Sequence, residues 1–400
     1  MSRRMCLFTD SLEPSGVGEH MLTLAACRPA GDQLALVCPP TPSGSQLLER
    51  ARGLGLEALA LAVRDQDAER PLVRWLGARR FDLFHCHAGI GWEGHHGIYA
   101  ARTAGVPRVV RTEHLPHLLT DPDQRLDHRR VVGQVDRLIC VSEGARATFL
   151  RAGIPAERLR VVRNGIEARR WARPGGGDRA EVRETIRGRL GLPTKVPLVL
   201  TVGRMVRQKG YQDLLEVVPG VLARRPDARF LWAGEGSMEG ELRARARALD
   251  VEDAVCFLGR RGDVPDLLAA ADLFVLPSRF EGLPLVALEA MAAGLPVVGT
   301  RVCGTSEVVL DRVTGRLVPA GSAPELTAAI LEALEQPERS AQWGAAGRER
   351  VEREFSAGRM AWETTAVYDE LFHEPATSDR RQVAAYAAEA GAMALASDGE

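Results

Sequence analysis

The amino-acid sequence predicts an α/β protein with two domains, each doubly wound around a parallel sheet that helices cover on both faces. Length is the first observation, because 400 residues exceed the roughly 100–200 of a typical single domain. Second, short runs rich in Val, Leu and Ile alternate with longer segments of helical period, which is the pattern of successive βαβ units. Third, this rhythm breaks between residues 164 and 197 and then restarts. We therefore place a domain boundary in that interruption.

The individual elements follow from the apolar runs. Buried strands are predicted at residues 5–9, 33–38, 81–86, 108–112 and 137–141, and again at 198–202, 229–233, 255–258, 273–276, 296–299 and 316–318. Helical periodicity predicts helices at 326–334, 342–353 and about 357–372. The expected domains are residues 1–170, completed by the helix at about 357–373, and residues 171–356, with a loose or helical tail at 374–400. Two such domains predict a central cleft that the carboxyl ends of both sheets face.

The composition narrows the classes of function. The chain has 52 basic and 53 acidic side chains, and it lacks the basic excess of a typical nucleic-acid binder, so we expect no nucleic-acid partner. No run of 18 apolar residues occurs and no signal-peptide core follows the basic start, which predicts a cytoplasmic protein with at most peripheral membrane contact. Seven scattered cysteines without C-x-x-C spacing predict reduced thiols. The sequence does not indicate the oligomeric state.

The segment from Gly203 to Gly210 combines two cations in the loop after a predicted strand. A guanidinium such as that of Arg204 grips two phosphate oxygens at once, whereas the ammonium of Lys209 acts as a mobile point charge. Lys209 is one of two lysines in the chain, in which the other 50 basic residues are arginines. The pair is suited to binding a pyrophosphate group.

A second cluster occupies residues 277–296. A buried strand stops at Pro277, a turn holds Glu281, and Pro284 stands where a helix can begin. The backbone amides near the start of that helix, together with the positive end of its dipole, predict an anion site. Glu289 lies eight residues after Glu281, within an apolar run where a carboxylate needs a partner, and we expect it two turns into the helix.

Taken together, these residues resemble the retaining, GT-B-fold glycosyltransferases of family 4. The resemblance covers about residues 5–370, and its fold consists of two Rossmann-like domains. It rests on Gly203-Arg204 with Lys209-Gly210, on the Glu-x7-Glu spacing and on the Gly-Leu-Pro after Glu281. The supporting pieces are FDLFHCH at 81–87, TEH at 112–114, VSE at 141–143, VRNGIE at 162–167, AGEG at 233–236, FLGR at 257–260 and DVP at 263–265.

The resemblance implies a donor site in the second domain. Arg204 and Lys209 would hold the diphosphate of a nucleotide sugar, for which a UDP- or GDP-sugar is expected, and Glu281 would bind hydroxyls of the donor sugar. Glu289 would accept hydrogen bonds from the ribose. The other members of this expected donor site are Gly203, Arg260 or Arg261 against the base, Ser278, Phe280, and the amides of Gly282 and Leu283.

In the first domain, the resemblance implies that His114 lies beside the reacting sugar. Gly16 and Gly18 match the family's glycine-rich loop near the phosphates, although the family has two adjacent glycines where this chain has Gly16-Val17-Gly18. His20, His87 and Asn164 are the expected acceptor-binding residues, because cleft histidines suit a hydroxyl-bearing acceptor. In such retaining enzymes the acceptor attacks from the face that the leaving group vacates, and a diphosphate oxygen takes its proton.

Several other patterns in the sequence are typical of different sites. The side chains of His85 and His87 have metal-ligand spacing, but the same spacing recurs in the family, where both line the cleft; we expect no bound metal. The Asp-x-Asp triplets at 65–67 and 121–123 are expected to be solvated turns. The glycines at 234–240 lack dinucleotide spacing. A nucleotide-sugar epimerase, a phosphorylase of the same architecture and a non-catalytic sugar-nucleotide-binding subunit remain the alternatives.

Overall fold

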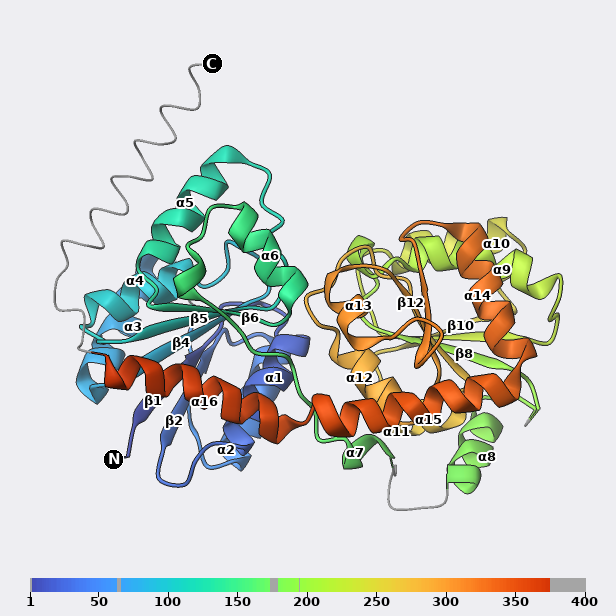
Figure 1. Ribbon diagram of the computed structural model, residues 1–400, viewed down its shortest axis with the longest axis horizontal. Coiled ribbons are helices and arrows are strands. Elements are labelled where there is room, and N and C mark those ends of the chain that lie inside the picture. The colour runs from blue at the N-terminus through green and yellow to red at the C-terminus, as the bar shows by residue number, and fades with distance from the viewer. Residues whose placement is uncertain (1, 63–65, 173–178, 194, 375–400) are drawn as a thin grey trace. The chain divides into compact units, whose positions relative to one another are not determined.

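The computed structural model describes residues 2–62, 66–172, 179–193 and 195–374 (Figure 1). These residues form two compact units, one containing the chain up to Asn164 together with the helix that starts at Ala357, and the other spanning Gly165–Ser356. The sequence analysis placed the boundary after residue 170. The Pro-Gly-Gly-Gly segment at 174–177 and the tail from residue 375 lie outside the described residues, and so does Asp65 of the first Asp-x-Asp triplet.

The first unit is built on a parallel sheet of seven strands in the order β3-β2-β1-β4-β5-β6-β7. The strands are β1 (Arg4–Phe8), β2 (Gln33–Cys38), β3 (Glu57–Ala60), β4 (Leu83–Ala88), β5 (Val109–Glu113), β6 (Arg137–Cys140) and β7 (Leu159–Val161). The helices are α1 (Ser15–Ala26), α2 (Pro42–Gly53), α3 (Gln66–Arg79), α4 (His95–Thr103), α5 (Pro122–Gly133), α6 (Glu143–Arg151) and α16 (Ala357–His373).

Alternate residues of each strand of the first unit enter different hydrophobic cores, as the period of two in a strand requires. Met5 and Leu7 of β1 pack with side chains of α1, α2 and α16. Cys6 and Phe8 pack with α3 and α4 instead. Because both faces are covered, most of the strands are largely apolar, which is the signal from which the sequence predicted them.

The second unit repeats the plan with six parallel strands in the order β10-β9-β8-β11-β12-β13. They are β8 (Leu198–Val202), β9 (Arg229–Ala233), β10 (Val255–Gly259), β11 (Leu273–Leu276), β12 (Val297–Thr300) and β13 (Gly315–Val318). The α-helices are α7 (Arg169–Ala172), α8 (Arg179–Arg189), α9 (Tyr211–Leu222), α10 (Glu239–Ala248), α11 (Val264–Ala270), α12 (Leu285–Ala292), α13 (Cys303–Val308), α14 (Ala323–Glu335) and α15 (Pro337–Glu354).

The predicted fold class is confirmed, and the differences from the predicted elements lie mainly at sheet edges and termini. The sequence analysis missed β3, which lacks β-branched residues and is only partly buried, and β7, which has three residues. It also gave no element to the stretch that holds α7 and α8.

Strand β4 begins and ends two residues later than predicted, which brings His87 into the strand. Asp121 is the N-cap of α5, accepting a hydrogen bond from the Gln124 amide at 2.9 Å, and is not part of a simple turn.

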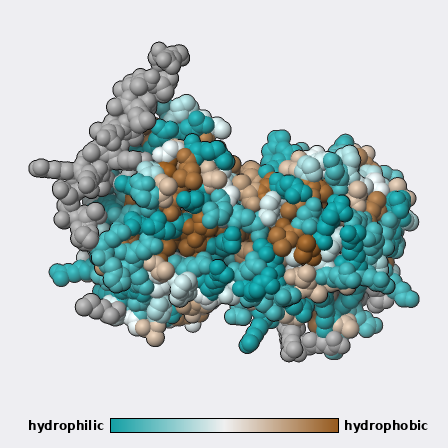
Figure 2. Space-filling view, in the orientation of Figure 1, coloured by the Kyte–Doolittle hydropathy of each residue, from teal (hydrophilic) through white to brown (hydrophobic). Residues whose placement is uncertain are grey.

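The strand order reverses between β1 and β4 in the first sheet and between β8 and β11 in the second. In doubly wound sheets, ligands bind beyond the carboxyl ends of the strands at such a reversal. The segments after these four strands are therefore the places to seek a site. No helix in the described part of the chain is both long and apolar enough to cross a membrane, and the surface in view is mostly hydrophilic with separate apolar patches (Figure 2).

Candidate active site

In the second unit, the loops after β8 and β11 are bonded to each other. The Arg279 amide donates to the Gln208 carbonyl at 2.8 Å, and Nε2 of Gln208 donates to the Phe280 carbonyl at 3.2 Å. Gly210 has a φ of 71°, and a Cβ there would lie 1.9 Å from the Pro277 carbonyl oxygen. Only glycine allows this close approach, which explains why a glycine follows Lys209.

Lys209 and Glu281 meet between these loops. Nζ of Lys209 lies 2.7 Å from Oε1 of Glu281, and the same oxygen accepts a hydrogen bond of 2.7 Å from Oγ of Ser278. The Glu281 side chain is 5% exposed and that of Lys209 18%. Thr300 in turn donates to the Ser278 carbonyl. A nearly buried carboxylate thus fixes the ammonium at the carboxyl end of the sheet, which is the preorganisation that a diphosphate site needs.

The remaining residues of the expected diphosphate and ribose site surround this pair in the chain. Gly203 accepts a 3.0 Å hydrogen bond from the Tyr211 hydroxyl, and Arg204 follows it, half-buried. Gly282 is buried just before α12. A Cβ on Gly304, in α13, would lie 1.8 Å from the Gly282 carbonyl oxygen, so α13 packs tightly on this turn. Leu283 is also buried.

The predicted position of Glu289 within its helix was wrong. Helix α12 begins at Leu285, after Pro284 as its N-cap, so half-buried Glu289 lies about one turn into the helix and not two. The sequence could not show this, because proline is accepted both as an N-cap and in the first turn.

Arg260 and Arg261, expected near the base, are both exposed. Arg261 forms an ion pair with Asp263 at 2.6 Å, and this hydrogen bond raises the pKa of the guanidinium. The Arg260 amide donates to Oε1 of Glu235 at 3.2 Å. The loop after β10 is therefore held by its own acidic neighbours.

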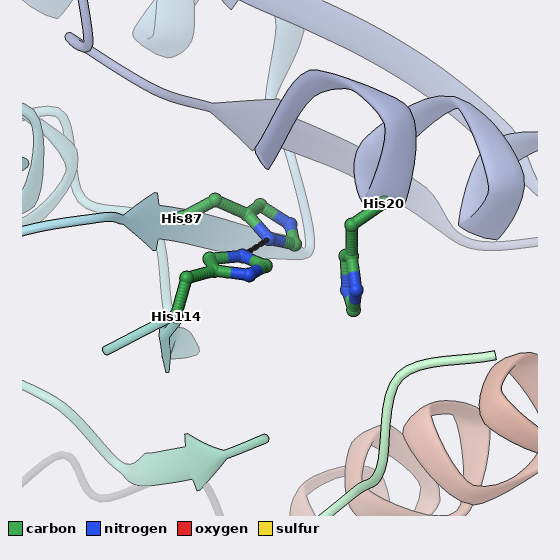
Figure 3. Close-up of side chains that lie close together, drawn as sticks. All are labelled: His20, His87 and His114. Carbon is green, nitrogen blue, oxygen red and sulfur yellow. Dashed lines mark hydrogen bonds between the residues drawn. The ribbon is translucent and has the colours of Figure 1, made fainter. Parts of the chain in front are cut away.

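In the first unit, three predicted site residues come together from three elements (Figure 3). Nδ1 of His87, on β4, lies 3.2 Å from Nε2 of His114, which follows β5. His20, on α1, presents its ring edge-on to His114 with ring centroids 4.7 Å apart. Its Nδ1 is bonded at 3.0 Å to Oδ1 of Asn164. All four residues chosen from the sequence thus form one cluster.

Burial sets the protonation of this cluster. It lowers the pKa of His20 to about 4, despite the opposing hydrogen bond with Asn164. It also lowers the pKa values of His87 and His114 well below their ordinary value, and neighbouring histidines add to the effect. The three imidazoles are therefore neutral at pH 7, and each offers both a donor and an acceptor nitrogen. Such groups suit hydroxyls better than anions.

Two expectations for the first unit need correction. Gly16 and Gly18 lie in the first turn of α1 and not in a loop, and a Cβ on Gly18 would approach the Leu47 side chain to 3.3 Å, so this glycine permits close packing of α1 on α2. His85 does not line an open site. It is fully buried, and its ring nitrogens bond the Tyr368 hydroxyl at 2.6 Å and Oγ1 of Thr112 at 2.7 Å, which ties α16 to the sheet.

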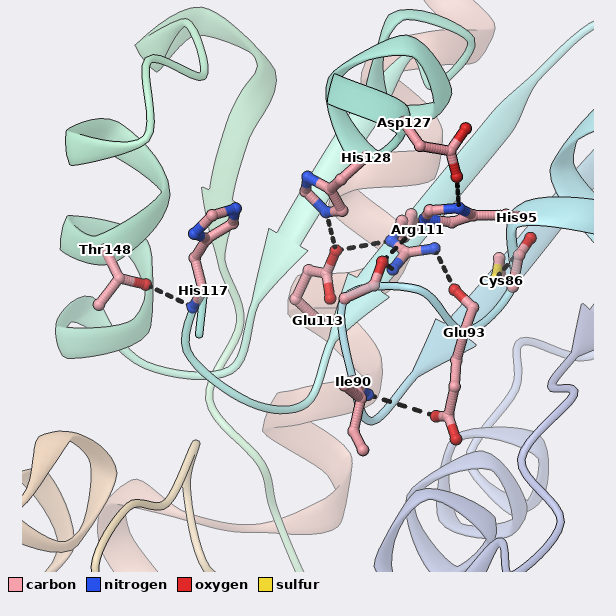
Figure 4. Close-up of polar contacts among 12 residues, drawn as sticks. Cys86, Ile90, Glu93, His95, Arg111, Glu113, His117, Asp127, His128 and Thr148 are labelled. Carbon is pink, nitrogen blue, oxygen red and sulfur yellow. Dashed lines mark hydrogen bonds and ion pairs between the residues drawn. The ribbon is translucent and has the colours of Figure 1, made fainter. Parts of the chain in front are cut away.

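The first unit also contains a buried polar network that was not predicted from the sequence (Figure 4). Arg111, which is fully buried on β5, donates to Glu113 at 2.6 Å and to the carbonyls of Glu93 at 2.6 Å and Gly91 at 3.1 Å. His128 bonds the same Glu113 oxygen at 3.1 Å. Burial alone would raise the pKa of Glu113, but the Arg111 guanidinium outweighs it and lowers that pKa to about 2. The one sequence feature that indicates this network is the presence of two charged residues, Arg111 and Glu113, within the buried run VVRTE.

Arg111 therefore holds the loop that follows β4. The Glu93 side chain reinforces the same loop by accepting from the amides of Gly89 at 2.7 Å and Ile90 at 3.3 Å. Asp10, after β1, accepts from the Gly94 amide at 2.8 Å. Strands β1 and β4 flank the strand-order reversal, so the network shapes the carboxyl end of the sheet, where His87 is the last residue but one of β4.

Family models match both halves of the chain. The model of the family Glycosyltransferase Family 4 matches residues 14–170, and that of Glycosyl transferases group 1 matches residues 182–350. The GDP-mannose-dependent monoacylated alpha-(1-6)-phosphatidylinositol monomannoside mannosyltransferase of Corynebacterium glutamicum is 33% identical over 267 residues, which are 64% of this chain and 68% of that protein. Alpha-maltose-1-phosphate synthase of Mycolicibacterium smegmatis is 32% identical over 310 residues, 70% of this chain and 78% of that protein.

Among solved structures, that of Anabaena HepE in complex with UDP and glucose superimposes with a TM-score of 0.79 at 22% identity, covering 92% of this chain and all of that one. This likeness shows the fold, which is GT-B. The predicted family and enzyme class are confirmed: the chain belongs to the group 1 glycosyl transferases of glycosyltransferase family 4.

Proposed function

We propose that this glycosyltransferase moves a sugar from a nucleoside-diphosphate sugar to a hydroxyl acceptor with retention of anomeric configuration, and that Arg204 and Lys209 stabilise the departing diphosphate. The observation that carries the proposal is the bonded group of Lys209, Glu281 and Ser278 at the point where the strand order of the second sheet reverses. A cation held by a nearly buried acid needs little reorganisation when negative charge develops beside it.

The chemistry follows from charge. Breaking the bond between sugar and phosphate leaves positive charge at the anomeric carbon and negative charge on the diphosphate. Lys209 supplies a positive charge that Glu281 already orients, and the guanidinium of Arg204 can bind two oxygens. In the proposed reaction a diphosphate oxygen accepts the acceptor's proton, so the proposal contains no metal ion and predicts that activity survives EDTA.

The neutral cluster in the first unit supplies the proposed acceptor contacts. His20, His87 and Asn164 offer donors and acceptors for hydroxyl groups, and His114 is the least buried of the three clustered histidines. For the donor we propose a UDP- or GDP-sugar, because the Corynebacterium relative is named as GDP-mannose-dependent and the Anabaena complex contains UDP.

A panel of UDP-, GDP-, ADP- and dTDP-sugars tests the proposal. We expect one UDP- or GDP-sugar to stabilise the protein by about 2.7 kcal/mol at 100 times its dissociation constant. With acceptor present, that donor should release its nucleoside diphosphate, and NMR should show the anomeric configuration of the donor retained in the product.

Each alternative has its own signature in this assay. Conversion of the donor without any acceptor would indicate an epimerase, and release of sugar 1-phosphate from a glycan would indicate a phosphorylase. Binding without turnover over a broad acceptor panel would favour a non-catalytic subunit. Inverted product would contradict the retaining step.

A further inference from the structure

The three histidines of the first unit have a geometry that hydrogen bonding to hydroxyls does not require. One nitrogen from each of His20, His87 and His114 lies within 4.8 Å of the others. Nitrogens bound tetrahedrally to zinc at 2.0–2.1 Å are about 3.3 Å apart. The 3.2 Å between Nδ1 of His87 and Nε2 of His114 already matches this nitrogen–nitrogen separation. Since no separation exceeds 4.8 Å, the widest one needs to shorten by at most roughly 1.5 Å for all three nitrogens to bind one ion.

We propose that His20, His87 and His114 form a binding site for a divalent transition-metal ion, best suited to Zn²⁺, and that the bound ion inhibits sugar transfer. Three imidazoles with an open fourth position are an established ligand set for zinc. The metal is not part of the proposed transfer reaction.

The surroundings of the cluster support metal binding. Asn164 presents a carbonyl-type oxygen to Nδ1 of His20, which places the proton on that nitrogen and leaves the lone pair of the opposite nitrogen available to a metal ion.

Burial also suggests where the ion enters. His20 and His87 are 2% and 0% exposed, whereas His114 is only half-buried. The fourth ligand, a water molecule or a hydroxyl, would therefore lie on the His114 side. Inhibition follows because the ion occupies a lone pair of His114, and this part of the inference rests on the proposed function, in which His114 lies beside the reacting sugar.

Metal binding is tested without reference to activity. Tag-free protein, freed of metal with EDTA and then of EDTA, is titrated with Co²⁺, whose visible absorption is intense in tetrahedral sites. We expect one Co²⁺ per chain, displaced by Zn²⁺. His20→Gln and His87→Gln should each weaken binding more than a hundredfold, and Asn164→Ala about 10–100-fold, because it removes the hydrogen-bond partner that orients the His20 ring. His96→Gln is the matched control, because His96 is an exposed histidine of α4 outside the cluster.

Absence of tetrahedral Co²⁺ absorption in the wild-type protein would overturn the proposal, as would unchanged affinity in a folded His20→Gln or His87→Gln variant. Circular dichroism and thermal melts establish that each variant is folded. The two substitutions lie on different elements, α1 and β4, so one folded variant is sufficient for the test.

Inhibition is measured once a donor and an acceptor support turnover. Zn²⁺ equimolar with the enzyme should lower the rate more than tenfold, and EDTA should restore it fully. Stoichiometric Co²⁺ or Zn²⁺ binding with an unchanged or increased rate would overturn the inhibitory part. A protein that binds Co²⁺ at the cluster but transfers no sugar in any metal state would instead count against the proposed function.

Discussion

Arg111→Met is the substitution whose effect the structure predicts most sharply. The Arg111 side chain is fully buried and that of Glu113 is 2% exposed, and the two are joined by an ion pair of 2.6 Å. Methionine fills much of the same space but leaves the Glu113 carboxylate with His128 as its remaining partner among the bonds described here. The Glu93 carbonyl also loses its bond from Arg111, and the Gly91 carbonyl keeps only its 2.8 Å bond with His95 Nε2 among the bonds described here.

The expected cost is large for a single substitution. Removing one partner of a buried ion pair destabilises by about 3–5 kcal/mol, because a charge is left in a medium of low polarity. For a unit of about 150–250 residues, each kcal/mol shifts the melting temperature by roughly 2–4 °C. The transition of the first unit should therefore fall by about 6–20 °C.

Differential scanning calorimetry of a matched set of variants makes this test decisive. Arg111→Met with Glu113→Gln removes both charges and should be less destabilised than Arg111→Met alone. Arg50→Met, which breaks the exposed pair with Glu19 in the same unit, should cost less than about 1 kcal/mol. If Arg111→Met shifted the transition no more than Arg50→Met, the inference that this ion pair supports the fold would be wrong.

Three further predictions concern single contacts. The folded-state pKa of Glu113 is about 2, below its ordinary 4.5, so its stabilising effect is complete above pH 4.5 and disappears as the pH falls toward 2; a Glu113→Gln variant should lose that part of the acid dependence in unfolding titrations. Gly210→Ala forces a Cβ against the Pro277 carbonyl and should weaken donor binding at least tenfold in calorimetric titrations, whereas unchanged affinity would show that the loop adapts. Tyr368→Phe leaves a ring nitrogen of buried His85 without its partner and should cost about 1–3 kcal/mol in denaturant unfolding, and a cost below 0.5 kcal/mol would contradict the role given to this bond.

Much of the second-unit site could be predicted from the sequence because its parts follow strands with strong apolar signals. Lys209 and Glu281 are 72 residues apart, yet each lies after a buried run, and the carboxyl ends of neighbouring parallel strands share one edge of the sheet. Their direct bond, and the hydrogen bond from Ser278, depend on the close approach at Gly210 and were not predictable.

The first-unit network was beyond sequence reasoning for a different reason. Arg111 and Glu113 lie two residues apart on β5, a spacing that by itself indicates one face of a strand. The other acceptors of Arg111 are backbone carbonyls of a loop about 20 residues earlier. Every residue type has a backbone carbonyl, so the sequence does not indicate which ones accept a hydrogen bond. Likewise, the burial of His85 depends on Tyr368 of α16, which lies 283 residues away in the chain.

The central claim is that the loop after β8 holds the diphosphate, and the most direct test is the transfer rate of four variants. Arg204→Ala and Lys209→Ala should each lower kcat at least 10²–10³-fold, the cost of removing one group that stabilises a developing anion. Arg207→Ala in the same loop and Lys195→Ala, the other lysine, are matched controls because both side chains are exposed, and they should transfer sugar at near wild-type rates. Folded Arg204→Ala and Lys209→Ala variants that transfer sugar as fast as these controls would contradict the claim.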